Sequence, residues 1–171
     1  SIGARSFQCT NFECQLKLPN SLTTIKTSAF SSSSFTGDLN LPINLENLEY
    51  SAFRDCIKLS GSLTIPNKIK TISYEAFSGC IGFNGNLNLP TEITDIGNRA
   101  FYDCHFLTGV LNIPESVKNI GYDSFYNCTS FTGPLKLPSS LTTINNRAFL
   151  NCSGLNGLLT IGPNVSSIAD D

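Results

Sequence analysis

Residues 62–85 read SLTIPNKIKTISYEAFSGCIGFNG, and residues 86–109 repeat the same pattern as NLNLPTEITDIGNRAFYDCHFLTG. Proline, isoleucine, Ala-Phe, cysteine and glycine recur at the same offsets in both stretches. The pattern extends in both directions, and its phenylalanine returns every 23 or 24 residues, at Phe7, Phe30, Phe53, Phe77, Phe101, Phe125 and Phe149. A fixed period in the low twenties is typical of a solenoid, in which each repeat forms one coil that buries its apolar side against neighbouring coils.

The repeat makes the chain one continuous array rather than one globular domain. Counting each unit from the residue before Leu-x-Leu gives six full coils of 23 or 24 residues, numbered 1 to 6 here, at 15–37, 38–61, 62–85, 86–109, 110–133 and 134–157. Partial coils at 1–14 and 158–171 flank them, and neither carries the polar cap that solenoids use to stay soluble. We therefore expect residues 1–171 to be part of a longer array, with terminal coils that pack against further repeats or another subunit.

Each coil begins with Leu-x-Leu or Leu-x-Ile, an alternation that predicts a short strand with one face toward the core. These strands are expected to pair in parallel between neighbouring coils, and the proline that follows ends each one because it has no N–H to donate. The later Ala-Phe-x-x-Cys segment predicts a tight helical or 3₁₀ turn. A glycine column closes the coils, where a positive φ or a tight corner is expected, at Gly37, Gly61, Gly85, Gly109, Gly133 and Gly157.

Five of the seven cysteines form one column, three residues after the phenylalanine, at Cys56, Cys80, Cys104, Cys128 and Cys152. Thr10 and Ser33 take this place in the two preceding repeats, so the column favours a small, weakly polar and buried side chain. We predict buried thiols. Neighbouring coils lie about 4.7–4.9 Å apart, a spacing that a disulfide also accommodates, so bridging and the redox compartment stay open, and Cys9 and Cys14 lie outside the column.

These columns resemble the BspA-like (Treponema-pallidum-type) leucine-rich repeat family. The resemblance rests on Leu63-Thr64-Ile65-Pro66, Ala76-Phe77-Ser78-Gly79-Cys80, Leu107-Thr108-Gly109 and Ser140-Leu141-Thr142-Thr143-Ile144, and it covers essentially all 171 residues. It implies a leucine-rich-repeat solenoid with short parallel strands on the concave face and extended or 3₁₀ turns on the convex face. It also implies proteins of bacterial surfaces and mucosal protozoa that bind host matrix proteins or other cells, with no shared catalytic motif.

Composition excludes several functions. The net charge is −2 and charged residues make up 14% of the chain, so no basic stripe exists to bind a nucleic-acid backbone. No apolar run of membrane-spanning length occurs in this segment.

Few residues in the chain could carry catalytic chemistry. The only histidine, His105, follows Cys104, but neighbours on a turn point in different directions, and a single histidine leaves a zinc site short of ligands. Asp55, Asp103 and Asp123 fall in turns without a paired partner at a repeated offset. We therefore predict no catalytic residue, no metal site and no cofactor. Three glycosylation sequons begin at Asn127, Asn151 and Asn164, and the cysteine column followed by Thr or Ser also generates such triplets by chance.

The strand face supplies the best predicted binding surface, because solenoids recognise partners on such extended sheets. The residues between the paired apolar positions point outward, at Lys17, Asn40, Thr64, Asn88, Asn112, Lys136 and Thr160. The preceding outward column adds polar residues at Asp38, Ser62 and Asn86. A second possible surface is a cluster of turn aromatics, Tyr102, Tyr122 and Tyr126, since tyrosine is enriched at interfaces.

Two hypotheses for the function follow. The first is a non-enzymatic recognition module of a cell-surface or secreted adhesin-like protein, whose partner is a host matrix or cell-surface protein. The second is an intracellular scaffold that docks along a larger assembly such as the cytoskeleton, with a scaffold protein as its partner.

Overall fold

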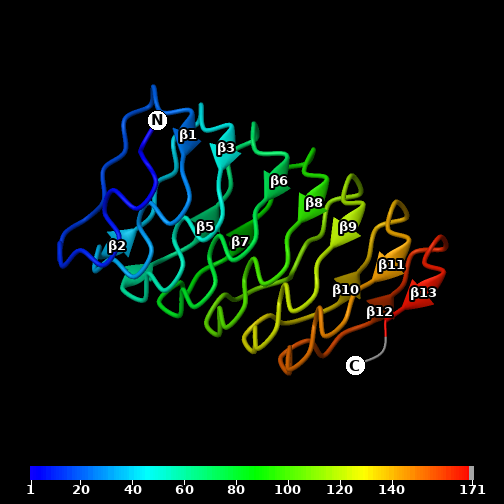
Figure 1. Ribbon diagram of the computed structural model, residues 1–171. Helices are drawn as coiled ribbons and strands as arrows, with labels where there is room; N and C mark the ends of the chain where they lie inside the picture. The colour runs from blue at the N-terminus through cyan, green and yellow to red at the C-terminus, as the bar shows by residue number, and fades with distance from the viewer. Residues whose placement is uncertain (170–171) are drawn as a thin grey trace.

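The computed structural model describes residues 1–169, which form a solenoid of stacked coils with no helix in that range. Within this described range, thirteen strands of two residues each lie in two rows along the solenoid, and every pairing between them is parallel (Figure 1). The leucine-rich-repeat solenoid with short parallel strands, expected from the sequence, is thus confirmed.

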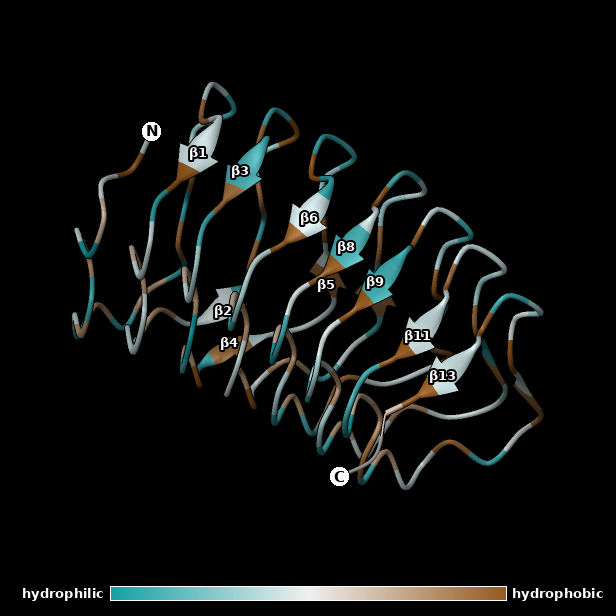
Figure 2. Ribbon diagram, turned by 45° about the vertical axis from the view of Figure 1, so that its right-hand side comes forward, coloured by the Kyte–Doolittle hydropathy of each residue, from teal (hydrophilic) through white to brown (hydrophobic). Residues whose placement is uncertain are grey.

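One row, called the Ile row here, uses the isoleucine column of each coil. It comprises β1 (Thr24–Ile25), β3 (Asn47–Leu48), β6 (Thr71–Ile72), β8 (Asp95–Ile96), β9 (Asn119–Ile120), β11 (Thr143–Ile144) and β13 (Ser167–Ile168). Each strand carries one polar and one apolar residue (Figure 2). Its pairs join equivalent residues of neighbouring coils, as in Ile72 with Ile96 and Ile96 with Ile120. The sequence did not predict this row as strands.

The other row, the Leu-x-Leu row, comprises β2 (Gly37–Asp38), β4 (Leu59–Ser60), β5 (Leu63–Thr64), β7 (Leu87–Asn88), β10 (Leu135–Lys136) and β12 (Leu159–Thr160). The predicted alignment of Leu-x-Leu segments is confirmed where Leu63 pairs with Leu87 and Leu135 with Leu159. Elsewhere it is wrong, because β2 pairs with β4 through Gly37 and Leu59, two residues before the equivalent position Gly61.

The glycine column follows this difference in register. Gly61 has a φ of 73° and precedes a coil whose Leu-x-Leu segment does not pair with the preceding one. Gly85 and Gly157 have no positive φ, and each precedes a Leu-x-Leu segment that does pair. There a Cβ on Gly85 would lie 2.8 Å from the backbone nitrogen of Ser62, so close coil contact requires glycine. The sequence predicted either a positive φ or a tight corner at this column. The structure has both, the positive φ at Gly61 and the tight corner at Gly85.

The core is a continuous stack of phenylalanine rings. Phe101 is fully buried, and its ring lies 5.8 Å from that of Phe77 and 5.3 Å from that of Phe125. Neighbouring rings in the stack are within 14° of parallel between Phe7 and Phe149. Leucine, isoleucine and alanine columns surround the stack and are buried in the middle coils. Each coil therefore completes its core only through its neighbours.

The cysteine column is buried, as predicted, and each thiol ties two coils together. The Sγ of Cys104 donates to the carbonyl oxygen of Phe77 in the previous coil at 3.1 Å, and the other four thiols make the equivalent bond at 2.9–3.1 Å. All five are free thiols. The Ala-Phe-x-x-Cys segment is a run of tight turns with i→i−3 bonds of the 3₁₀ type, such as Cys80 N–H to the carbonyl oxygen of Phe77 at 3.2 Å, and these turns do not extend into a helix among residues 1–169. Its backbone amides alternate between carbonyls of their own coil and of the next, as at Ala76 and Phe77.

Candidate functional site

The polar ribbon predicted on the Leu-x-Leu row lies at the surface, with every residue in it exposed. Its ten members are Lys17, Asp38, Asn40, Ser62, Thr64, Asn86, Asn88, Asn112, Lys136 and Thr160. We call this set the polar ribbon. It extends from coil 1 to the C-terminal partial coil. In coils 1 to 6 each Leu-x-Leu segment buries or half-buries its apolar residues and leaves the residue between them outside, whereas Leu159 and Ile161 of the last partial coil are themselves exposed.

Side chains of the polar ribbon contact one another where the Leu-x-Leu segments pair. The Nδ2 of Asn88 donates to Oγ1 of Thr64 at 3.0 Å, and the backbone N–H of Asn86 donates to Oγ of Ser62 at 3.1 Å. Lys136 instead forms an ion pair with Glu115. The middle of the ribbon is therefore an ordered surface of amide and hydroxyl groups, able to donate and accept hydrogen bonds.

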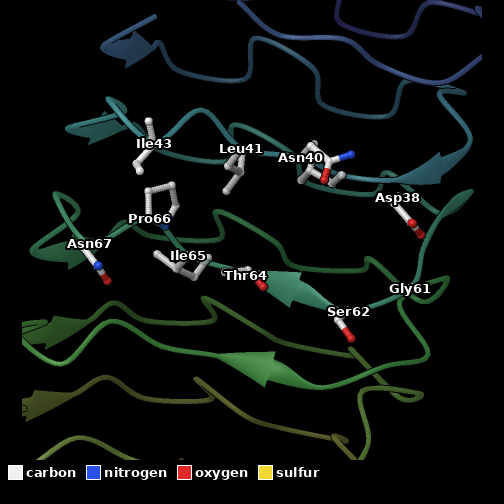
Figure 3. Close-up of a pocket in the computed structure, with 11 residues that line it drawn as sticks. Asp38, Asn40, Leu41, Ile43, Gly61, Ser62, Thr64, Ile65, Pro66 and Asn67 are labelled. Carbon is white, nitrogen blue, oxygen red and sulfur yellow. The ribbon is translucent and has the colours of Figure 1, made fainter. Parts of the chain in front are cut away.

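A groove of about 640 Å³ interrupts the polar ribbon between coils 2 and 3 (Figure 3). Four ribbon residues line it: Asp38 and Asn40 from coil 2, and Ser62 and Thr64 from coil 3. The groove is not predicted by the repeat pattern, because regular repeats imply that the Leu-x-Leu segments of these two coils pair.

The predicted cluster of turn aromatics is also brought together. The rings of Tyr102 and Tyr126 stack at 4.8 Å with their planes 5° apart. Tyr122 joins them through Arg99, whose guanidinium lies 5.6 Å from the ring centroid of Tyr102 and 5.7 Å from that of Tyr122. Of the three, Tyr122 is exposed and the others are half-buried, so the surface offered to a partner is small.

A charged column runs beside these tyrosines. Asp123 is buried, and its carboxylate pairs with Arg99 at 3.2 Å on one side and Arg147 at 2.8 Å on the other. Arg99 in turn lies 3.8 Å from Glu75. Asp123 therefore has partners at the repeat offset, which the expectation of unpaired carboxylates missed. The sequence does carry a signal for this charged column: the position two residues before the core phenylalanine holds Glu75, Arg99, Asp123 and Arg147 in successive coils, with alternating charge.

The buried thiols of the cysteine column are unreactive. Burial is the main cause that raises the pKa of Cys56 to about 11 and of Cys152 to about 12, and it raises the pKa of Cys80, Cys104 and Cys128 as well. A thiol becomes nucleophilic as a thiolate, so these groups are inert at neutral pH.

The single histidine has no catalytic surroundings. His105 Nε2 lies 3.7 Å from the carboxylate of Asp103 on a partly exposed turn, while Cys104 is fully buried beneath it. No group of three or more metal-ligating side chains comes together among residues 1–169. Neither side chain is placed to act on a bound substrate as a nucleophile and base pair.

The three sequon asparagines already use the nitrogen to which a glycan would be attached. Nδ2 of Asn127 donates to Asp103 and Nδ2 of Asn151 donates to Asn127, each at 2.8 Å. Nδ2 of Asn164 donates to the carbonyl oxygen of Ser139 at 2.8 Å. Glycosylation at these positions stays an open prediction.

The Ile row carries a second polar surface that sequence analysis missed. Asn47, Thr71 and Asn119 are exposed outward positions on three of its strands, and Nδ2 of Asn119 donates to Asp95 in the preceding coil at 2.6 Å. The signal is the polar residue directly before each isoleucine, a two-residue alternation too short to identify a strand by itself.

Comparison with known proteins gives a family for this architecture. Residues 1–132 and 58–171 match the family described as BspA type leucine rich repeat region. Among proteins with curated descriptions, none matches the chain.

Two solved structures are similar. A leucine-rich repeat protein of T. pallidum is 26% identical, with a TM-score of 0.73 over 88% of this chain and 71% of that protein. A leucine-rich cell surface protein of Faecalibacterium prausnitzii A2-165 is 21% identical, with a TM-score of 0.53 over 85% of this chain and 53% of that one. Residues 1–169 contain no helix of the length and hydrophobicity that a membrane span needs.

Proposed function

Because the chain belongs to the BspA type leucine rich repeat family, we propose that it is a non-enzymatic module that binds a protein partner, within a cell-surface or secreted adhesin-like protein. Leucine-rich repeat solenoids serve as scaffolds for protein recognition. The F. prausnitzii structure, which shares the fold, is described as a cell surface protein and supports the location. A host matrix or cell-surface protein is the partner class that this location implies.

The observation that carries the proposal is the polar ribbon. A buried Phe and Ile core supports it, and where Leu-x-Leu segments pair, as in coils 3 and 4, neighbouring coils present amide and hydroxyl groups to a partner about 4.7–4.9 Å apart. Preorganised groups of this kind reduce the entropy lost on binding.

The test measures binding of the 171-residue chain to immobilised fibronectin, laminin and collagen. The variant Asn88→Arg plus Asn112→Arg changes two exposed ribbon residues in neighbouring coils, so we expect unchanged thermal unfolding and binding weakened about tenfold or more, because two bulky cations disturb the fitted surface. Asn47→Arg plus Asn119→Arg places the same charges at exposed positions of the Ile row and serves as the matched control.

Equal losses in both variants would point to a general charge effect rather than a ribbon site. Unchanged affinity in the Asn88 and Asn112 variant would move the site to the turn tyrosines Tyr102, Tyr122 and Tyr126. No binding of the parent chain to any of the three matrix proteins would remove the matrix partner.

An intracellular scaffold is the second candidate function, and the thiols favour it. All seven cysteines are free in the structure, with Cys9 and Cys14 exposed, and exposed thiols persist in reducing compartments. Surface biotinylation of intact cells distinguishes the two locations. Labelling of the native protein supports the adhesin, whereas labelling only after lysis supports the scaffold.

A further inference from the structure

The groove between coils 2 and 3 exists because the backbone ladder there closes early. Asp38 pairs with Ser60, and the chain then passes through Gly61 and Ser62 before the next Leu-x-Leu segment begins at Leu63. Within the described residues 1–169, no backbone hydrogen bond joins residues 39–41 to residues 63–65. Two neighbouring extended segments therefore lie side by side without a ladder between them.

Coil 3 turns unpaired backbone groups toward this groove. The backbone N–H of Leu63 donates to the carbonyl oxygen of Asn86 at 2.9 Å, and that of Ile65 donates to the carbonyl oxygen of Asn88 at 3.0 Å. Both acceptors lie in coil 4. In an extended strand the N–H and C=O groups alternate sides from one residue to the next. The backbone N–H and C=O of Thr64 consequently point the other way, toward coil 2.

Coil 2 contributes the matching groups. Leu39 and Leu41 occupy the repeat positions of Leu63 and Ile65, whose N–H groups point toward the following coil. By the same geometry, the N–H groups of Leu39 and Leu41 point toward coil 3.

The N–H of Leu39 belongs to the β2–β4 ladder, in which Asp38 pairs with Ser60. Among residues 1–169, the N–H of Leu41 and the N–H and C=O of Thr64 have no backbone partner. Each side of the groove therefore offers a short unpaired strand edge, a template for pairing with another chain.

The side chains give the groove two distinct ends (Figure 3). At one end Leu41 and the exposed Ile43 lie across from Ile65 and Pro66. At the other end Asp38 provides the only charge among the lining residues.

The carboxylate of Asp38 lies against Gly61, where a Cβ would come within 2.3 Å of its Oδ1. Ion pairs among the described residues use other carboxylates. Asp38 is therefore available to a cation from outside.

We propose that this groove binds an extended peptide segment of the partner as an added parallel strand. The peptide backbone pairs with Leu41 on one side and with Thr64 on the other. A lysine or arginine of the peptide lies beside Asp38, and an apolar side chain about three residues later packs against Leu41 and Ile65. About five residues, or about 16 Å of strand, span the groove. This inference rests on the proposed function and names the chemistry of the partner.

The probe is the acetylated and amidated peptide Lys-Val-Thr-Ile-Thr, titrated into the ¹⁵N-labelled 171-residue chain. We expect saturable shifts of the amide signals of Leu41 and Thr64, together with slower hydrogen exchange at the same two amides. Methylating the backbone nitrogen of the central threonine of the peptide should weaken binding about threefold to tenfold, because a hydrogen-bond donor is lost.

Asp38→Lys should weaken binding about fivefold or more, and the same peptide with Glu in place of Lys should bind this variant better than it binds the parent chain. Asp95→Lys, on the Ile row, is the matched control and should leave the peptide affinity unchanged.

Two results would overturn the groove as a peptide site: no shifts at Leu41 and Thr64 at millimolar peptide, or equal affinity of the methylated and unmethylated peptides. Peptide variants keep the test valid even if Asp38→Lys fails to fold. Loss of matrix-protein binding in the Asn88 and Asn112 variant, with no peptide binding, would leave the proposed function standing while the groove fails.

Discussion

Replacing Phe101 by alanine tests the stacked core directly. The Phe101 ring is fully buried and lies between Phe77 at 5.8 Å and Phe125 at 5.3 Å, so its removal leaves a cavity that neither neighbouring coil can fill. A buried Phe→Ala change typically costs about 3–5 kcal/mol, and the loss of contact with two stacked rings favours the upper part of that range. Urea unfolding of the 171-residue chain, followed by circular dichroism, measures the change.

The matched control is Phe106→Ala in the same coil. Phe106 is 57% exposed and lies outside the ring stack, so its loss should change the free energy of unfolding by less than about 0.5 kcal/mol. An unchanged slope of free energy against urea would show that the coils still unfold together. If Phe101→Ala cost no more than Phe106→Ala, the rings would not hold the coils together, and the account of the core would be wrong.

Two further predictions concern the thiol and charged columns. Burial raises the pKa of Cys56 to about 11 and of Cys152 to about 12, above the ordinary value of 9.0, so the folded state keeps protons that the unfolded state loses. These protonated thiols therefore leave the free energy of unfolding undiminished below pH 9, and that free energy falls as the pH rises toward 11–12. Urea unfolding midpoints measured across that pH range should decline, and they should decline less steeply in the variant Cys152→Ser. Asp123→Asn removes the charge held between Arg99 and Arg147 and should lower the free energy of unfolding by about 1–3 kcal/mol, whereas an unchanged urea midpoint would show that the column adds nothing to stability.

Much of the fold could be predicted from single columns of the sequence. Phe77 and Phe101 predicted a repeated core because side chains at one repeat position meet in neighbouring coils. The column of Cys104 holds small residues in the first repeats, which predicted a buried thiol. The position of Asn88 between Leu87 and Leu89 predicted an exposed ribbon residue. These predictions hold because each depends on one position and its periodic equivalents.

Positions that depend on several residues at once were harder to predict. Asp123 looked isolated because its partners, Arg99 and Arg147, lie one coil away on each side, and only the stacked structure places them together. The Ile row was missed because two residues per coil form strands only through the neighbouring coils. The roles of the polar ribbon and of the turn tyrosines in binding stay predictions.

By itself, the sequence determined the period, the inward columns and the parallel stacking of coils, since burial of apolar side chains at fixed intervals allows no other arrangement. Only the tertiary structure decided the register of the Leu-x-Leu row. Gly61 and Gly85 occupy the same column, yet one adopts a positive φ and the other a close contact with Ser62. Glycine permits both conformations at similar energy, so packing against the neighbouring coil determines which conformation each glycine adopts. The register of the following Leu-x-Leu segment, and the presence of the groove between coils 2 and 3, depend on that packing.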